Sequence, residues 1–434
     1  MEERILAKTI TTTELAERRV EPNLIIVDIR SMNAYNGWKL RDEARGGHIR
    51  GAVACPDALT ANLPAADMMN LLGTKGIVPE KTVVIYGYRD RRSSDFADGL
   101  AKMDFKEVLV YDAGIETWSA NPNLPMDHLA RHEKLVHPQW VHDLLDGNNP
   151  ETYNNNSFAI FHVTFGAFEE YQAGHIPGAY HLDTISLESN EDWNRRSPRE
   201  LEETFLSHGI RHDTTVVVYG RDSNPSMLLE HPGKKAGQIA ATRAAAILMY
   251  AGVEDVRLLD GGLDAWLSAG YEIETNLNTP LPVEDFGQPI PFRPEYIVDI
   301  DEAKSLIADP NGVLVSVRSW KEYIGETSGY HYILPKGRIA GSVWGNCGSD
   351  AYHMQNYRNG DNTMREFNEI AAFWREMGIT PDKRVAFYCG TGWRASETFF
   401  YAYVMGWPHI AVYDGGWLEW SSNENNPIES GVPS

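Results

Sequence analysis

The sequence is poor in cysteine, and its cysteines are widely spaced. Of 434 residues only three are cysteine, Cys55, Cys347 and Cys389, and they form no Cys-x-x-Cys pair. This pattern excludes a disulfide-stapled scaffold and a cysteine-rich zinc site. The 14 histidines are scattered and no carboxylate-rich cluster accompanies them, so we expect no metal site.

Long apolar runs and positive charge are also scarce. Nothing approaches 18 continuous apolar residues, so we expect no transmembrane helix. The opening stretch MEERILAKTITTTELAERR lacks the apolar core of a signal peptide. Lys and Arg total 39 against 61 Asp and Glu, a formal net charge of −22. That charge argues against a nucleic-acid or anionic-membrane partner, and an anionic substrate would need a local positive pocket.

The sequence has the length and hydrophobic content to build several cores. A chain of 434 residues suggests two to four domains at roughly 100–200 residues each. Its 42% hydrophobic content, with 12 Trp, 20 Tyr and 14 Phe, is typical of a globular protein.

Four motifs each occur three times along the chain, which indicates internal repetition. An apolar strand pattern followed by a polar segment occurs in LIIVDIRSMNAYN (24–36), FAIFHVTFGAFEEY (158–171) and VLVSVRSWKEY (313–323). A Gly-x-Ile-x-Gly element occurs in GGHIRGAVACP (46–56), AGHIPGAYHLD (173–183) and KGRIAGSVWGN (336–346). A strand that ends in Tyr occurs in TVVIYG (82–87), TVVVYG (215–220) and RVAFYC (384–389). A strand followed by Asp, a glycine turn and Trp occurs in VLVYDAGIETW (108–118), VRLLDGGLDAW (256–266) and IAVYDGGWLEW (410–420).

Short apolar strands that alternate with helices predict an α/β fold with parallel sheets and right-handed crossovers. The long period and two proline-rich joints, 121–138 and 275–295, predict three tandem domains. We place these domains at residues 1–125, 126–278 and 279–434.

One of the three domains carries a nucleophile where ligands bind in such folds. Ligands bind beyond the carboxyl ends of parallel strands, where Gly87, Gly220 and Cys389 occupy equivalent positions. We therefore predict a catalytic third domain and two domains that lack a catalytic cysteine. The loops 87–95 and 220–237 of those two domains are left open as anion-binding sites without chemistry.

The turn YCGTGWRASE (388–397) has the composition of a pocket for a thiolate and an anion. Gly390 and Gly392 permit a close backbone approach, so successive N–H groups can converge at the positive end of the following helix. In such settings the pKa of a cysteine falls from about 8.5 to roughly 3.5–7.5. Arg394 adds a fixed positive charge that suits sulfonate or phosphate oxygens.

Two chemistries use such a pocket: phosphate-ester hydrolysis through phosphocysteine and sulfur transfer through a cysteine persulfide. Four residues separate Cys389 from Arg394. This tight loop fits a single sulfur atom, whereas a phosphoryl group needs one more residue. The loop length favours sulfur transfer over a tyrosine or dual-specificity phosphatase or an arsenate reductase.

As a set, the motifs resemble the rhodanese family of sulfurtransferases. The resemblance rests on the D-x-R-like strand ends, the GHIPGA element, the Cys-X4-Arg loop after an FY strand, and YDGGWLEW. It covers most of the chain and is strongest to the bacterial three-rhodanese-domain thiosulfate sulfurtransferases. It implies a parallel five-stranded sheet flanked by helices in each domain.

The resemblance also implies a mechanism and a set of site residues. The Cys389 thiolate attacks the outer sulfur of thiosulfate, sulfite leaves, and the remaining persulfide is taken by cyanide, a thiol or a protein thiol; no cofactor is needed. The Thr391 hydroxyl adds a hydrogen bond. The expected cradle of the persulfide consists of the backbone amides of Gly390, Thr391, Gly392, Trp393 and Arg394.

The third domain departs from the family pattern around its strand ends. Ser316 replaces the usual Asp, although Arg318 is kept, and Arg338 replaces the usual His. We expect Arg318 and Arg338 to bind substrate, with Lys336 adding positive charge near the donor. The added segment IGETSGYHYILPK (324–336) is expected to lie over the pocket. These changes affect the choice of donor, for which 3-mercaptopyruvate is the alternative to thiosulfate.

Other recurring residues are predicted to be structural. Cys55 is assigned to the core and Cys347 is not assigned to the chemistry, although a resolving thiol is its alternative role. The repeated tryptophans and histidines also occur in domains without a nucleophile, which favours structural roles for them. These residues are Trp118, Trp266, Trp417, Trp420, His48 and His175.

The sequence is also consistent with another function and with more than one cellular compartment. A rival function is that of a persulfide carrier or docking protein with little turnover on small acceptors. We expect a monomer. The resemblance implies export to the periplasm, with the cytoplasm as the alternative.

Overall fold

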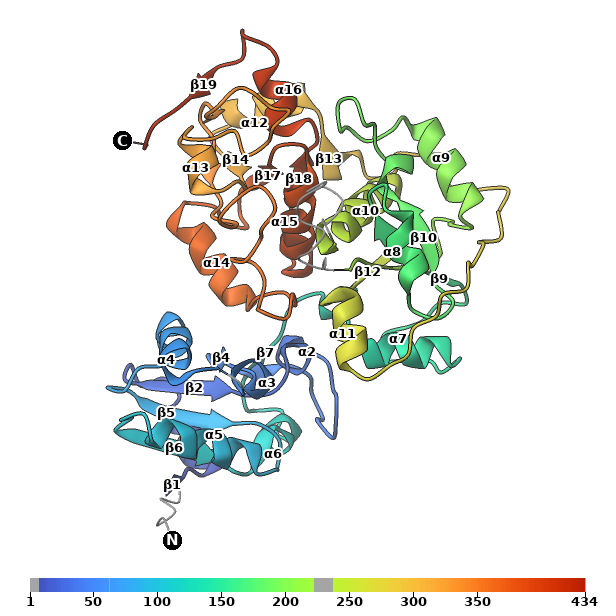
Figure 1. Ribbon diagram of the computed structural model, residues 1–434. Coiled ribbons are helices and arrows are strands. Elements are labelled where there is room, and N and C mark those ends of the chain that lie inside the picture. Colours follow the sequence, from blue (N-terminus) through green and yellow to red (C-terminus); the bar gives the residue numbers. More distant parts are fainter. Residues whose placement is uncertain (1–7, 62, 222–236, 434) are drawn as a thin grey trace. The chain divides into compact units, whose positions relative to one another are not determined.

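The protein consists of two compact units in a computed structural model that describes residues 8–61, 63–221 and 237–433 (Figure 1). The first unit is Met1–Glu133 and holds one domain, and the second is Lys134–Ser434 and holds two. Most of the second domain's loop 220–237 lies outside the described residues. No helix in the described ranges is long and apolar enough to cross a membrane.

The first domain is a parallel five-stranded sheet in the order β1-β6-β5-β2-β4. An antiparallel pair joins β3 (His48–Ile49) to β7 (Met126–Asp127). The sheet strands are β1 (Lys8–Thr9), β2 (Leu24–Asp28), β4 (Val53–Ala54), β5 (Thr82–Tyr86) and β6 (Glu107–Tyr111). The helices are α1 (Thr12–Arg18), α2 (Met32–Asn36), α3 (Asp57–Thr60), α4 (Ala65–Thr74), α5 (Arg92–Ala101) and α6 (Gly114–Ala120).

The second domain repeats this topology in the order β10-β9-β11-β12-β8. Its strands are β8 (Leu135–Val136), β9 (Phe158–Thr164), β10 (Tyr180–Asp183), β11 (Thr215–Tyr219) and β12 (Asp255–Leu259). Its helices are α7 (Pro138–Leu145), α8 (Phe168–Ala173), α9 (Pro198–Ser207), α10 (Gln238–Ala251) and α11 (Gly262–Ser268).

The third domain has the order β13-β18-β17-β14-β16. An antiparallel pair joins β15 (Arg338–Ile339) to β19 (Ile428–Glu429). The sheet strands are β13 (Ile297–Val298), β14 (Gly312–Ser316), β16 (Val343–Trp344), β17 (Arg384–Tyr388) and β18 (Ile410–Tyr413). The helices are α12 (Ile300–Ala308), α13 (Trp320–Tyr323), α14 (Phe367–Glu376), α15 (Trp393–Val404) and α16 (Gly416–Ser421).

The predicted α/β class with three parallel five-stranded sheets is confirmed. The central strands are mainly apolar because helices cover both faces of each sheet, and every residue of β2 and of β11 is buried. The repeated tryptophans Trp118, Trp266, Trp417 and Trp420 are buried, as the sequence predicted.

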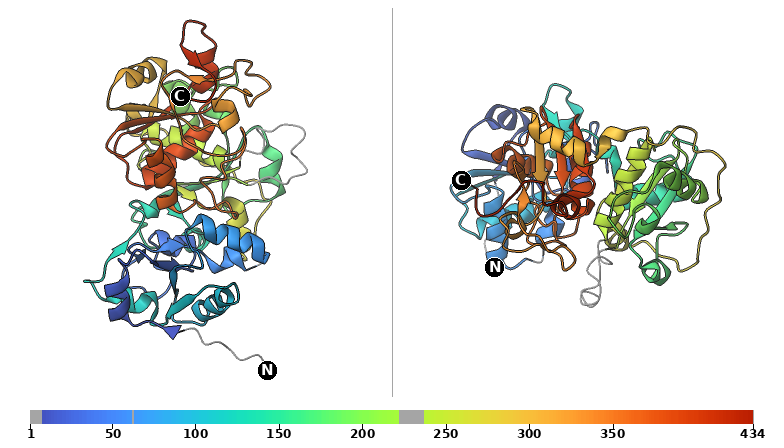
Figure 2. Two further views of the ribbon diagram at one scale, coloured as in Figure 1. Left: turned by 90° about the vertical axis from the view of Figure 1, so that its left-hand side faces the viewer. Right: turned by 90° about the horizontal axis from the view of Figure 1, so that it is seen from above.

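The second and third domains pack through the helices that follow their central strands. Figure 2 shows these two domains side by side, and α10 contacts α15 along their length. All residues of α10 are buried, as are nearly all of α15. α10 is therefore largely apolar, and its polar side chains Gln238, Thr242 and Arg243 are buried as well. The helix that follows the Cys389 loop therefore belongs to the domain interface.

Candidate functional site

Cys389 lies where the carboxyl end of β17 turns into α15. β17 ends at Tyr388, whose hydroxyl accepts a hydrogen bond from the Ile339 amide at 3.2 Å. Gly392 is the N-cap of α15 and has φ +85°, a left-handed conformation that glycine adopts without strain. The turn therefore places Cys389 close to the N-terminus of α15, which is the positive end of the helix dipole.

Backbone hydrogen bonds fix the loop while leaving its amides available. The carbonyls of Cys389 and Gly390 accept hydrogen bonds from the Trp417 and Leu418 amides at 2.8 and 3.0 Å. Within the described part of the chain, the N–H groups of residues 390–394 donate to no protein acceptor. These are the donors that a persulfide or an oxyanion on Cys389 requires.

The insertion 324–336 covers this loop through two tyrosines. A Cβ added to Gly390 would lie 2.3 Å from Tyr330 Cε2, so only glycine allows the ring to approach this closely. Burial raises the pKa of Tyr332 above its ordinary value, and the nearby Thr391 side chain acts to lower it. The Cys389 side chain is fully buried under this cover. The expectation that the insertion lies over the pocket is confirmed by these contacts.

Arg394 is buried and most of its donors are already used. Its Nη1 and Nη2 donate to the two oxygens of Glu322 at 3.0 and 2.9 Å. Nη1 also donates to the Asp350 carbonyl at 3.0 Å, and Nη2 to the Tyr330 hydroxyl at 2.9 Å. Among the described residues, Arg394 Nε has no hydrogen-bond partner. This nitrogen is the donor left for a ligand.

Glu322 is a negatively charged carboxylate, whereas Tyr330 is an uncharged phenol. Burial acts to raise the pKa of Glu322, but the guanidinium groups of Arg394 and Arg318 outweigh it and lower the pKa to about 2. Loss of hydration raises the pKa of Tyr330 well above its ordinary value. Tyr330 is therefore a neutral phenol at physiological pH. Because its oxygen accepts from Arg394, its hydroxyl hydrogen is available to donate.

Arg318 holds the cover in place. Its guanidinium is paired with Glu322 at 3.2 Å and donates to the carbonyls of Ser328 and Gly337 at 3.2 and 2.7 Å. It also stacks over the Trp417 ring. Arg318 therefore reaches the Cys389 loop through Glu322 and the covering segment.

Arg338 lies in β15 and faces the C-terminal strand. It is paired with Glu429 at 3.0 Å and donates to the Gly431 carbonyl at 2.7 Å. Its contacts in the described ranges do not include the Cys389 loop.

The first and second domains have a histidine at the repeat position of Arg338. His48 and His175 each donate through Nδ1 to the backbone carbonyl of the equivalent tyrosine. Lys336 Nζ donates to the Glu326 carbonyl.

Cys347 is a buried thiol beside the arginine. Its Sγ donates to the Val317 carbonyl at 2.9 Å and lies 3.9 Å from Arg394 Nη1. Burial raises the pKa of Cys347 to about 12. Cys347 therefore stays protonated at neutral pH and is a poor nucleophile.

The second domain adds an aromatic wall beside the loop. The indole of Trp393 lies edge-on to Phe165 and to Trp193, with ring centroids 5.5 and 6.3 Å apart. Trp193 stacks on Tyr332 at 5.8 Å. We call these four side chains the aromatic wall: Phe165, Trp193, Tyr332 and Trp393.

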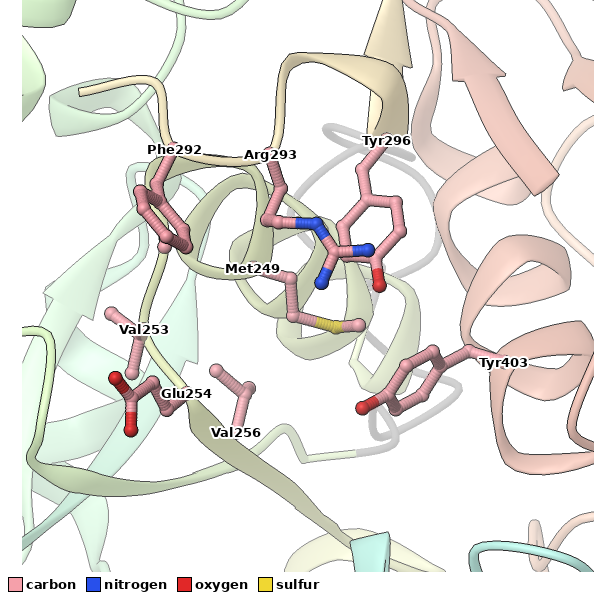
Figure 3. Close-up of a pocket in the computed structure, with 9 residues that line it drawn as sticks. Met249, Val253, Glu254, Val256, Phe292, Arg293, Tyr296 and Tyr403 are labelled. Atoms are coloured by element: carbon pink, nitrogen blue, oxygen red, sulfur yellow. The ribbon is translucent and has the colours of Figure 1, made fainter. Parts of the chain in front are cut away.

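Two cavities help to locate the site. A cavity of about 410 Å³ lies against the covering segment and is lined by Lys321, Glu322, Tyr330, Asp350 and Tyr352 among others. A smaller cavity of about 80 Å³ lies near the C-terminal ends of α10 and α15 (Figure 3). There the Arg293 guanidinium lies over the Tyr296 ring, and Met249 and Tyr403 are among the other lining residues. Because Cys389 precedes the N-terminus of α15, the smaller cavity is separate from its loop.

The structure brings Cys389, its loop and Arg394 together with residues that the sequence did not indicate. Glu322, Phe165 and Trp193 are distant from Cys389 in sequence. Glu322 and Phe165 lie within the repeated strand motifs, but nothing in those motifs connects them to the cysteine loop. The only available signal for Tyr330 was the aromatic content of the insertion. The described residues contain no group of three or more His, Cys, Asp or Glu side chains that could hold a metal.

Comparisons with known proteins agree with this architecture. A family model described as the rhodanese-like domain matches residues 11–121, 137–269 and 299–423. The chain is 38% identical over 427 residues to the thiosulfate sulfurtransferase YnjE of Escherichia coli (strain K12), covering 98% of this chain and 92% of YnjE.

Solved structures of EanB are similar over nearly the whole chain, at 46% identity and TM-scores of 0.94 to 0.95. The match covers 98 to 99% of this chain and 99 to 100% of EanB. One holds ergothioneine in a tyrosine variant, and another holds hercynine in a threonine variant. A third carries a cysteine persulfide in a tetrahedral intermediate state with ergothioneine. Together with the three matched domains, these similarities show that the chain belongs to the rhodanese family of sulfurtransferases.

Proposed function

We propose that this sulfurtransferase moves one sulfane sulfur atom through a Cys389 persulfide to the imidazole ring of hercynine or a similar betaine. The observation that carries the proposal is a shared spacing. The tyrosine, the threonine and one of the two further cysteines substituted in the EanB structures stand at the same sequence distances from the persulfide cysteine as Tyr330, Thr391 and Cys347 stand from Cys389. The position of the other cysteine corresponds to Ser316.

The aromatic wall supports an acceptor that carries a quaternary ammonium group. Hercynine is the trimethylammonium betaine of histidine, and aromatic faces bind such cations through cation–π attraction. Phe165 and Trp193 are only partly buried, so part of each side chain is accessible to a ligand. The chain's net charge of −22 also favours a cationic group over an anionic one.

The first half-reaction charges the cysteine. The Cys389 thiolate attacks the outer sulfur of a small anionic donor, for which we propose thiosulfate. A new S–S bond forms, the bond to the sulfonate sulfur breaks, and sulfite leaves with the bonding electron pair. The amides of residues 390–394 and Arg394 Nε hold the persulfide anion that remains.

The second half-reaction discharges the persulfide onto carbon. A C–S bond forms at C2 of the imidazole, the S–S bond breaks, Cys389 departs as a thiolate, and the C2 proton is released. The sulfane sulfur is reduced as the carbon is oxidised, so no external oxidant is required. The neutral Tyr330 phenol lies over the loop with its proton available, which suits it to move a proton to or from the imidazole.

A thiol or cyanide acceptor is the second candidate, and the identity to the thiosulfate sulfurtransferase YnjE favours it. In that case the aromatic wall would have no part in turnover. A 3-mercaptopyruvate donor and a carrier role remain variants of the same Cys389 chemistry. A monomeric state and a periplasmic location also remain predictions.

A competition between acceptors tests the proposal. Purified protein is supplied with thiosulfate and either hercynine or cyanide, and ergothioneine and thiocyanate are measured by mass spectrometry and colorimetry. We expect kcat/KM for hercynine to exceed that for cyanide by at least about tenfold, and Cys389→Ser to form neither product. Thiocyanate without ergothioneine would favour the second candidate.

A further inference from the structure

Arg243 belongs to the second domain, which lacks a catalytic cysteine, and it contacts several parts of the proposed active site. It lies on α10, is fully buried, and donates through Nε to Glu188 Oε2 at 2.8 Å. Its Nη2 donates to the Trp193 carbonyl at 3.0 Å and is paired with Asp414 at 2.7 Å. A Cβ on Gly392 would lie 3.1 Å from Arg243 Nη1, so the guanidinium lies against the Cys389 loop.

Through Glu188, Arg243 reaches Trp393. The same Oε2 atom of Glu188 that Arg243 binds accepts the indole N–H of Trp393 at 3.1 Å. Burial raises the pKa of Glu188 to about 8, although Arg243 opposes the shift. Arg243 and the Trp393 indole are the groups that favour the charged form of this buried side chain against the cost of burial.

Trp193 is also held in a conformation that needs support. Its φ is +63°, in the left-handed region that bulky residues rarely adopt. The Arg243 bond to its carbonyl and its own amide bond to the Ser189 carbonyl at 3.0 Å fix this turn. The strained turn directs the Trp193 ring toward Trp393 and Tyr332.

The domain interface contains two sets of contacts that are related by the repeat. The Arg195 amide donates to Asp414 at 2.9 Å, and the Met364 amide donates to Asp260 at 2.8 Å. Arg243 is paired with Glu188, whereas Arg358 is paired with Glu397. The two arginine–carboxylate pairs are related by the repeat, and the Arg243 pair bonds an active-site side chain, the Trp393 indole, through Glu188.

We propose that Arg243 is a positioning residue through which the second domain sets the geometry of the aromatic wall, and hence the affinity for the sulfur acceptor. The proposal rests on the proposed acceptor. Arg243 does not touch the persulfide; it acts through Glu188 on Trp393 and through the backbone on Trp193. The cysteine-less domain thus forms one side of the active site.

The test separates acceptor binding from sulfur loading. Arg243→Met is compared with Arg358→Met, which breaks the related buried pair at the same interface. Three quantities are measured: persulfide loading by thiosulfate, transfer to cyanide, and KM and kcat for hercynine. We expect Arg243→Met to raise KM for hercynine at least about tenfold, with loading and cyanide transfer within about threefold of wild type. Arg358→Met should keep persulfide loading, transfer to cyanide, and KM and kcat for hercynine within about threefold of wild type.

Substitutions of Glu188 give an independent test should Arg243→Met fold poorly. Glu188→Gln keeps an oxygen that accepts the Trp393 indole N–H, so its KM should remain near wild type. Glu188→Leu removes the acceptor and should raise KM as Arg243→Met does. An equal rise in KM for Arg358→Met, or loss of loading in Arg243→Met, would overturn the proposal in favour of a general structural role.

A spectroscopic readout keeps the inference distinct from the proposed function. The indole N–H resonance of Trp393, assigned with Trp393→Phe, should shift in Glu188→Leu and Arg243→Met and stay in place in Arg358→Met. If the wild type does not convert hercynine, the proposed acceptor is wrong. The Trp393 resonance then decides by itself whether Arg243 positions Trp393. An unmoved resonance in Arg243→Met would overturn the inference.

Discussion

Near Cys389, the positive charge of Arg394 is already partly neutralised by its ion pair with Glu322. Its guanidinium serves Glu322, Tyr330 and a backbone carbonyl, and only Nε has no partner in the described ranges. Arg394 therefore supports the loop as well as any ligand. The amides at the start of α15, which donate to no acceptor among the described residues, add to the positive field at the sulfur.

The Glu322 carboxylate should stabilise the fold in a pH-dependent way. Its pKa is lowered to about 2 from an ordinary 4.5, so the stabilisation is present in full above pH 4.5 and is lost as the pH falls toward 2. A shift of this size corresponds to about 3 kcal/mol. We predict that Glu322→Gln lowers the unfolding free energy by about that amount at pH 7 and by much less near pH 3.

Urea unfolding at the two pH values measures this difference. The control is Glu326→Gln, which removes an exposed carboxylate from the neighbouring segment and should change stability little at either pH. A difference between wild type and Glu322→Gln that does not depend on pH would contradict the predicted ion pair.

The Tyr330 hydroxyl should matter for discharge of the persulfide and not for its formation. Tyr330→Phe keeps the ring over the loop but removes the proton donor. We predict that the rate of transfer to hercynine falls by about 100-fold or more, whereas loading by thiosulfate changes by less than about threefold. Rapid-quench measurement of each half-reaction checks this, and a matching loss in both would assign Tyr330 to loop structure.

At the scale of elements, the site depends on the contact between the loop after β17 and the covering insertion. Tyr330 occupies the space that a side chain at Gly390 would need. Cys389 has no exposed surface in this arrangement, so the cover has to yield when a substrate enters. The insertion therefore both completes the site and controls access to it.

Gly390→Ala tests this contact. The added methyl group would meet Tyr330 at 2.3 Å, and the ring must move away. We predict a loss of at least about tenfold in transfer to hercynine, and a much smaller loss when Gly390→Ala is made in a Tyr330→Ala background, because the two changes share one contact. Fully additive effects in this double-mutant cycle would contradict the packing described here.

Local elements could be predicted from the sequence, and distant partners could not. The strand, the glycine turn and the helix start around Cys389 are contiguous, so propensity and spacing indicate them. The partner of the Trp393 indole, Glu188, is 205 residues away, and no local pattern connects the two. Arg338 illustrates the same limit, because its carboxylate partner Glu429 lies on a strand that pairs with β15 only in the folded domain.

At the scale of the whole molecule, one unit contains all the groups described around Cys389. Every residue assigned here to the loop, the cover, the aromatic wall and the Arg243 pair lies within Lys134–Ser434. This unit has its own core and includes the α10–α15 interface. The second and third domains therefore form one compact unit.

A chain of residues 134–434 should keep the sulfur chemistry. We predict persulfide loading and KM for hercynine within about twofold of the full chain, since a compact unit with its own core folds independently. Loading assays on the purified fragment measure this. Circular dichroism confirms that it is folded, and a folded fragment that fails to load would show that the first domain contributes to catalysis.

The most direct test of the account is a single turnover with labelled sulfur. The protein is loaded with thiosulfate that carries a heavy outer sulfur, freed of excess donor, and mixed with hercynine. We predict that intact mass shows one heavy sulfur on wild type and none on Cys389→Ser, and that this sulfur then appears in ergothioneine in equal amount. A labelled persulfide that remains on Cys389 in the presence of hercynine would contradict the proposed acceptor, and absence of the label from Cys389 would contradict the persulfide itself.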